Sequence, residues 1–282
     1  MKKFKLLGLL LVIPFLAGCN GSVSLGNYEN ADKYLIGNQV YQGNITTINV
    51  DWISGEVKLI ADENASDIKI VEENTLKDED KVHTWFTDGT LNVKFFAANH
   101  RAQIDPRDKH VAITYNPSYL ERASLSLTSG RLITPTLNVK EEVLVELTSG
   151  NAEIEGIITK RVNLYQTSGS MTINKLEADK LMINSTSGHI DIKNVDINEL
   201  NAKLTSGNLA LSLNRLNSGI INLTSGSVSV KLPSDGGKVT IDKTSGTINA
   251  SREHTQSGNL YTFGEGSMTL SISLTSGSVT LF

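Results

Sequence analysis

The side chains that could hold a metal ion or move protons are few and scattered. No pair of the five histidines forms an H-x-x-x-H or H-E-x-x-H pattern, the spacings that place two imidazoles on one helix face; they are His83, His100, His110, His189 and His254. The richest polar segment, residues 99–110, holds two of them and two aspartates, a conceivable metal site. It also holds three cations and a proline, so a solvated loop is the favoured interpretation.

Acidic side chains give no clear catalytic pair. The run Glu72, Glu73, Asp78, Glu79 and Asp80 is interspersed with lysines and is interpreted as a solvated connection between strands. A later segment, 252–254, supplies one acid, Glu253, beside His254. Glycan hydrolysis typically uses two facing carboxylates, so the sequence predicts that the protein is not an enzyme.

Serine is abundant in one repeated triplet. Thr-Ser-Gly occurs eight times, with successive spacings of 20, 19, 19, 19, 19, 20 and 31 residues. The triplets end at Gly130, Gly150, Gly169, Gly188, Gly207, Gly226, Gly246 and Gly277. No G-x-S-x-G nucleophile elbow occurs, and the strict period indicates structural turns rather than nucleophiles. A further Ser-Gly at Gly258 predicts that the last gap is one coil plus a 12-residue insertion.

The elements between these turns alternate apolar and polar residues. After Gly188, for example, Ile190 and Ile192 alternate with polar neighbours, and two more apolar groups follow before the next triplet. Steps of two residues indicate strands with one face inward. The prediction is an all-β, single-chain β-solenoid (β-helix) of stacked 19–20-residue coils. Its glycines would take positive φ at the corners, and its Thr and Ser hydroxyls would bond along the stack.

The chain before the regular array is β-rich but irregular. Residues 31–125 hold strand candidates and a degenerate repeat at Ile53-Ser54-Gly55, and residues 126–282 form the predicted solenoid. Ten of the sixteen aromatic residues lie between Tyr28 and Tyr119. They are expected to fill or cap one end of the core, with stacking on a sugar or peptide as the alternative.

The first nineteen residues have the pattern of an export signal. Three lysines precede the apolar stretch 6–15, which is too short to span a bilayer. The following Leu16, Ala17, Gly18 and Cys19 resemble the lipobox of a bacterial lipoprotein signal. The resemblance implies cleavage after residue 18 and a covalent lipid on Cys19, with no other cofactor. Residues 19–30 are interpreted as the lipidated cysteine and a flexible tether.

Composition excludes several classes. The chain has 39% hydrophobic and 20% charged residues, which argues against disorder. Its formal net charge is −4, and removal of three leader lysines leaves −7, so no nucleic-acid partner is expected. One cysteine excludes a disulfide framework.

Three segments carry a family resemblance: residues 50–59 (VDWISGEVKL), 111–117 (VAITYNP) and the first complete repeat, 127–130 (LTSG). With them, residues 45–282 resemble the bacterial putative-adhesin family of unknown function, whose members carry Ser-Gly β-repeats. The resemblance implies an extracytoplasmic β-solenoid and supplies no catalytic residue.

The functional prediction is a membrane-anchored cell-envelope lipoprotein that binds a protein, glycan or cell-wall ligand. It would face the periplasm from the outer membrane in a Gram-negative cell, or lie outside the plasma membrane in a Gram-positive one. The alternative is a scaffold that self-associates through coil ends, because Val279, Leu281 and Phe282 end the chain without a polar cap. A glycan-active β-helix enzyme is the third possibility.

Overall fold

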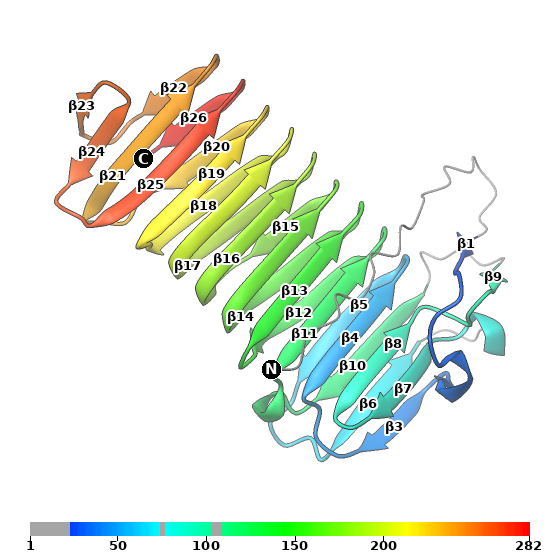
Figure 1. Cartoon of the computed structure of the whole chain (residues 1–282). Coiled ribbons are helices and arrows are strands. Elements are labelled where there is room, and N and C mark those ends of the chain that lie inside the picture. The colour runs from blue at the N-terminus through cyan, green and yellow to red at the C-terminus, as the bar shows by residue number, and fades with distance from the viewer. Residues whose placement is uncertain (1–22, 74–76, 103–108) are drawn as a thin grey trace, which may run out of the picture.

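The computed structural model describes residues 23–73, 77–102 and 109–282, and Figure 1 shows them as an elongated stack of strands. The predicted signal peptide and the lipobox residues Leu16, Ala17, Gly18 and Cys19 lie outside these ranges. Within them the secondary structure consists of β-strands and short 3-10 helices, with no α-helix. The all-β prediction is therefore confirmed.

The repeat region forms the long part of the stack. Its strands are β11 (Arg122–Leu127), β12 (Arg131–Asn138), β13 (Glu142–Leu147), β14 (Asn151–Gln166), β15 (Ser170–Ile173), β16 (Leu176–Ser185), β17 (His189–Leu204), β18 (Asn208–Arg215), β19 (Ser218–Leu223), β20 (Ser227–Lys231), β21 (Gly236–Lys243), β22 (Thr247–Ala250), β23 (Thr255–Ser257), β24 (Leu260–Gly264), β25 (Met268–Leu274) and β26 (Ser278–Leu281). From β11 to β20, strands one repeat apart pair in parallel.

The parallel register brings the same repeat position of successive coils side by side. One inward row is made of Ala152, Met171, Ile190, Leu209 and Val228, all buried. A single coil cannot cover such side chains, whereas a neighbour about 4.8 Å away on each side does. Full burial of one of the larger side chains stabilises the fold by roughly 1.5–3 kcal/mol. We call these stacked coils the rod.

The N-terminal part extends the rod. Its elements are β1 (Val23–Ser24), η1 (Ala31–Lys33), β2 (Leu35–Ile36), β3 (Gln39–Gln42), β4 (Thr47–Trp52), β5 (Glu56–Ala61), β6 (Asp67–Glu72), η2 (Asp78–Asp80), β7 (His83–Thr87), β8 (Thr90–Lys94), β9 (Arg101–Ala102), β10 (His110–Tyr115) and η4 (Pro117–Tyr119). β4 pairs with β11 and β5 with β12, so Ile53-Ser54-Gly55 makes the first turn of the stack, as predicted.

Residues 23–30 are held against the domain rather than free. β1 pairs antiparallel with β9, and Leu25 N donates to His100 O at 3.1 Å. Tyr28 Oη donates to Phe96 O at 3.2 Å. The predicted flexible tether is therefore wrong for these residues, because main-chain pairing fixes them.

The end of the chain corrects a second prediction. β25 pairs with both β19 and β21, and β26 pairs with both β20 and β22. The last strands in sequence thus lie between two earlier coils: in Figure 1 the red β25 and β26 lie between the orange β21 and β22 and the yellow β19 and β20. Gly258 lies in the β23–β24 connection instead of starting a coil. Val279 and Leu281 are fully buried, so they do not form an open coil end.

The eight predicted turn glycines each lie in the short connection between two strands. Four of them, Gly169, Gly226, Gly246 and Gly277, have positive φ, but the other four do not. What they share is close approach, since a Cβ at seven of them would lie 2.0–2.8 Å from the carbonyl oxygen of the neighbouring turn glycine, and at Gly188 2.2 Å from Gln166. Most turns therefore exclude a Cβ by packing between coils, whatever their φ.

The Thr and Ser hydroxyls of the turns make fewer hydrogen bonds between coils than predicted. Most hydrogen bonds between neighbouring turns join main-chain atoms: Ser149 N donates to Thr128 O at 2.7 Å, and equivalent bonds recur along the rod. Four serine hydroxyls also donate to the carbonyl of the neighbouring coil, those of Ser129, Ser149, Ser168 and Ser245. Most of the triplet threonines are exposed and form a ridge.

Candidate functional site

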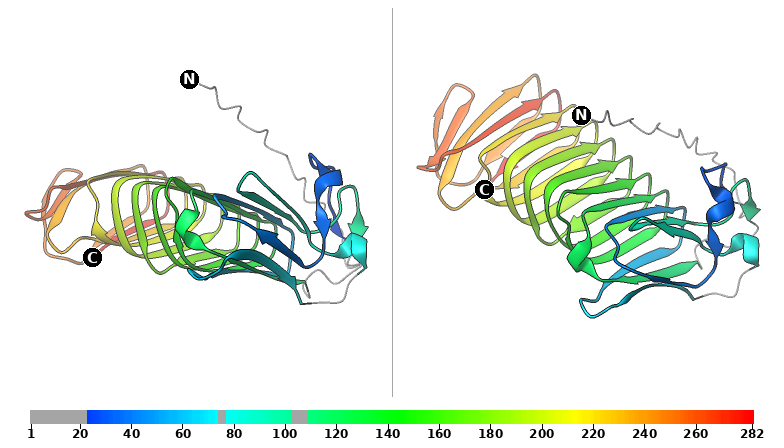
Figure 2. Two further views of the ribbon diagram at one scale, coloured as in Figure 1. Left: turned by 90° about the horizontal axis from the view of Figure 1, so that it is seen from below. Right: turned by 60° about the horizontal axis from the view of Figure 1, so that its bottom comes forward.

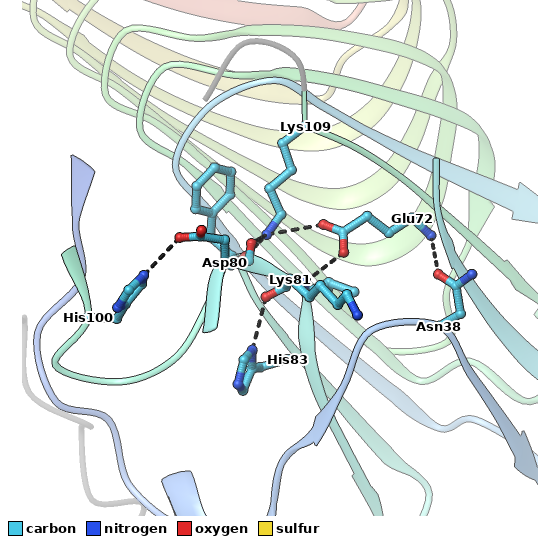
Figure 3. Close-up of polar contacts among 9 residues, drawn as sticks. Asn38, Glu72, Asp80, Lys81, His83, His100 and Lys109 are labelled. Atoms are coloured by element: carbon cyan, nitrogen blue, oxygen red, sulfur yellow. Dashed lines mark hydrogen bonds and ion pairs between the residues drawn. The ribbon is translucent and has the colours of Figure 1, made fainter. Parts of the chain in front are cut away.

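A buried polar cluster lies at the N-terminal end of the rod, where β6, η2 and β10 meet (Figure 3). Lys109 is 1% exposed and its Nζ lies 3.1 Å from Glu72 Oε1. The same Nζ donates to the carbonyl oxygens of Asp80, at 2.5 Å, and Phe95. It also lies 4.5 Å from the centre of the Phe95 ring. The ammonium group is therefore enclosed by acceptors and aromatic surface.

Burial dominates the electrostatics of this cluster. It lowers the pKa of Lys109 to about 8, while the nearby carboxylates Glu72 and Asp80 oppose the shift. Burial also lowers the pKa of His83, whose Nδ1 lies 2.9 Å from Lys81 O. Glu72 is fixed from both sides, since its Oε2 accepts from Val82 N at 3.0 Å.

The cluster corrects the interpretation of both polar segments in part. Glu73, Asp78 and Glu79 are exposed as predicted, and Asp105 and Asp108 lie outside the described residues. Glu72 and Asp80 are buried at 7% and 6% exposure instead of lying in a solvated connection, and Lys109 is not a loop cation. Asp80 also lies 2.8 Å from His100 Nε2. Across residues 23–73, 77–102 and 109–282 no three His, Cys, Asp or Glu side chains are placed to hold a metal ion. The ion pair and main-chain hydrogen bonds that hold these groups lie at the end of the core, which is the arrangement of a structural cap.

The remaining predicted candidates lie apart from one another. His110 begins β10, His189 begins β17, and Glu253 is exposed. His254 packs against the rings of Tyr261 and Phe263, with centroids 5.5 and 5.2 Å away. Of the aromatic residues expected to fill or cap this end, Trp52, Phe95 and Phe96 lie in the N-terminal core, as predicted, whereas Trp85 is only half-buried.

A groove on the face of the rod was not predicted. It has a volume of about 740 Å³ and is lined by β14, β16, β17, β19, β25, β21 and β24, in their spatial order. Because these seven strands cross it side by side, it runs along the rod for about 29 Å. Its volume lies in the range of small-molecule sites. Figure 2 shows this part of the rod from two further directions.

Two outward rows of side chains form the walls. One row is Arg161, Lys180, Glu199, Ser218, Thr269 and Lys238, and the other is Asn163, Met182, Asn201, Ile220, Ser271, Thr240 and Leu260. Between them β19 carries Gly219, whose inward side is filled by Leu200, Leu216 and Leu270. The hollow therefore opens to the outside of the rod.

The charges of the groove are mainly positive. Lys180 pairs with Glu199 at 2.7 Å, and Arg161 lies 3.8 Å from Glu142. Lys238 is exposed and has no ion-pair partner within the described part of the chain. Glu199 is the one carboxylate among the lining residues, so the groove lacks the pair of acids that glycan hydrolysis typically uses. Its composition suits binding.

The fold and groove define an elongated all-β protein. The model of the Toastrack DUF4097 family matches residues 45–281, and the chain belongs to that family. No curated protein matches the chain. None of the described helices is long and apolar enough to cross a membrane.

Solved structures share this fold at low identity. A putative adhesin from Bacteroides fragilis is 14% identical, with a TM-score of 0.57 over 88% of this chain and 97% of its own. A putative adhesin from Parabacteroides distasonis is 16% identical, with a TM-score of 0.56 over 88% and 97%. A putative lipid binding protein from the same species is 16% identical, with a TM-score of 0.57 over 87% and 97%.

Proposed function

We propose that the mature protein is a lipid-anchored β-solenoid of the bacterial cell envelope that binds an envelope component without chemical conversion. The groove along the rod is the observation that carries this proposal, because it is a preformed hollow lined by positive, polar and apolar groups. The names of the neighbouring structures, adhesins and a lipid binding protein, agree with a binding role.

The anchor is proposed from the sequence alone. Two or three acyl chains on Cys19 would hold the protein firmly, since each buried methylene contributes about 0.8 kcal/mol. Cells fed a clickable palmitate analogue are expected to label the wild-type chain and to leave Cys19→Ser unlabelled. Labelled wild-type protein in the membrane fraction supports the anchor, and equal labelling of Cys19→Ser contradicts it.

Binding is tested with the chain from residue 20 onward, which lacks the lipid. We expect it to be retained by isolated envelopes, and Ile220→Asp to be retained at least tenfold less. Val71→Asp is the matched control, because Val71 is 46% exposed on β6, far from the groove, and Ile220 is 51% exposed. Equal retention of wild type and Ile220→Asp would remove the groove from the proposal.

The two other functions have weaker support. The predicted scaffold depended on Val279, Leu281 and Phe282 as an open end. Val279 and Leu281 are buried between β20 and β22, and of the three only Phe282 is exposed, at 44%. A glycan-active enzyme would need a second carboxylate beside Glu199, and the groove lining offers none.

A further inference from the structure

We propose that the groove binds a single-chain amphiphile with an anionic head group. The acyl chain would lie along the rod between Ile220 and Leu260, and the head group would pair with Lys238. This inference rests on the proposed binding function and names the ligand class of the same groove.

The apolar part of the argument begins with Ile220. It is 51% exposed on β19, and in the spatial order of strands Ser271, Thr240 and Leu260 follow it in the same outward row. The side chains of Ser271 and Thr240 are short, so they leave a trough about 14 Å long whose two ends are formed by Ile220 and Leu260. An acyl chain in this trough would remove both of these apolar side chains from water.

The other outward row, which runs beside the trough, also carries short side chains on β19 and β25. Ser218 and Thr269 stand where the preceding strands β16 and β17 carry Lys180 and Glu199. Lys180 and Glu199 pair with each other at 2.7 Å, and the row continues with the shorter Ser218 and Thr269 where the trough begins. The trough is therefore shallow and open to solvent, and its lining residues include no aromatic ring. That lining suits a flexible chain better than a sugar, which typically stacks on a ring.

Charge selects the head group. Lys238 lies on β21, which pairs with β24, the strand that carries Leu260. The lining residues of β19, β25, β21 and β24 include no carboxylate. The protein as a whole carries a net charge of −4, so the positive charge of this part of the groove is opposite in sign to the charge of the chain. Within the described part of the chain the Lys238 ammonium has no ion-pair partner, and it lies beside a trough that ends at Ile220 and Leu260. This arrangement matches a carboxylate or phosphate on an acyl chain.

The experiment is a calorimetric titration of the chain from residue 20 onward with dodecanoate below its micellar concentration. Amide chemical shifts would locate the site. We expect one site, with shifts confined to residues 218–220, 238–240 and 269–271 and to Leu260. Dodecyl maltoside and dodecyltrimethylammonium, with the same alkyl chain, are expected to bind at least fivefold more weakly.

Variants separate the two parts of the site. Ile220→Asp, and the milder Ile220→Ser, should weaken dodecanoate binding at least tenfold and threefold, with circular dichroism unchanged. Lys238→Glu should reverse the preference between dodecanoate and dodecyltrimethylammonium. Val71→Asp and Lys203→Glu, at exposed positions outside the groove lining, should bind as wild type.

Three results would overturn the inference: no dodecanoate binding, unchanged binding by both Ile220 variants, or shifts at the N-terminal end of the rod. If envelopes retain the protein through Ile220 while dodecanoate does not bind, the proposed function stands and only the ligand class is wrong. If envelopes do not retain the protein but dodecanoate binds in the groove, the envelope role is wrong and the ligand class stands.

Discussion

Lys109 shows how one buried charge is held at the end of the core. Its ammonium group contacts Glu72, two carbonyl oxygens and the rings of Phe95 and Trp52. Attraction within such a pair offsets the desolvation of two charges only while both partners are present. The residue scale therefore yields two predictions, one from deletion and one from pH.

Lys109→Met is expected to lower the free energy of unfolding by about 3–5 kcal/mol, because it leaves the Glu72 carboxylate buried without its partner. Adding Glu72→Gln should recover most of this loss, since the amide oxygen can still accept from Val82 N. Urea unfolding of the three proteins measures both values. A double variant no more stable than Lys109→Met would show that the cost is lost packing instead.

The free energy of unfolding should also depend on pH through Lys109. Its pKa falls from 10.5 to about 8 on folding, so between these values the unfolded chain binds the extra proton and stability rises with pH. The rise amounts to at most about 3 kcal/mol. Burial raises the pKa of Tyr115 to about 12, which acts in the opposite direction above pH 10. The measurement is the free energy of unfolding of the wild type minus that of Lys109→Met/Glu72→Gln, from pH 7.5 to 9.5. We expect this difference to rise with pH, and a difference that falls with pH would contradict the account.

At the scale of the element, the turn between strands depends on an absent Cβ. Gly169 has φ +89°, and a Cβ there would lie 2.0 Å from Gly150 O. Gly258 has φ +62° but nothing within 4 Å of its Cβ position. These two glycines separate backbone strain from close packing between coils.

Gly258→Ala should destabilise by about 1–2 kcal/mol, the cost of a left-handed alanine. Gly169→Ala should cost about 3–5 kcal/mol, because the overlap with Gly150 O adds to that strain. Thermal and urea unfolding of both variants give the comparison. Equal losses would mean that the turns require glycine only for its φ.

At the scale of the whole molecule, the order of coils along the rod differs from their order in sequence. The coil of Gly277 lies between those of Gly226 and Gly246, so the last coil in sequence is not the last coil along the rod. Hydrogen bonds at 3.0 Å from Ser278 N to Gly226 O and at 2.9 Å from Thr247 N to Gly277 O establish this sequence of turns.

Paired cysteines test this order in the chain from residue 20 onward, which has no natural cysteine. Ser229 and Thr280 are register partners, so Ser229→Cys/Thr280→Cys should form a disulfide on oxidation. Ser229→Cys/Asn249→Cys should not, because β26 separates the two strands by about 9.6 Å. A disulfide in the second pair and none in the first would mean that the coils follow sequence order.

The sequence predicts the rod better than its ends or its groove. Alternating apolar residues and the glycine period identify the strands and turns, because each coil must bury its inner row against a neighbour. All turns offer the same main-chain donors and acceptors, so the period cannot tell which neighbour Gly246 takes. Lys109 resembles a loop cation until folding surrounds it with carbonyl oxygens. The groove arises from small residues on β19 and β25, and their effect depends on which strands flank them.

The central claim, that the groove of the rod is where the protein meets the envelope, is tested most directly by photo-crosslinking in living cells. A photoreactive phenylalanine would replace Ile220 in the full chain, with replacement of Val71 as the control. The account predicts a light-dependent adduct with an envelope component at position 220 and none at position 71. An adduct at 71 alone, or none at either position in a folded and exported chain, would contradict it.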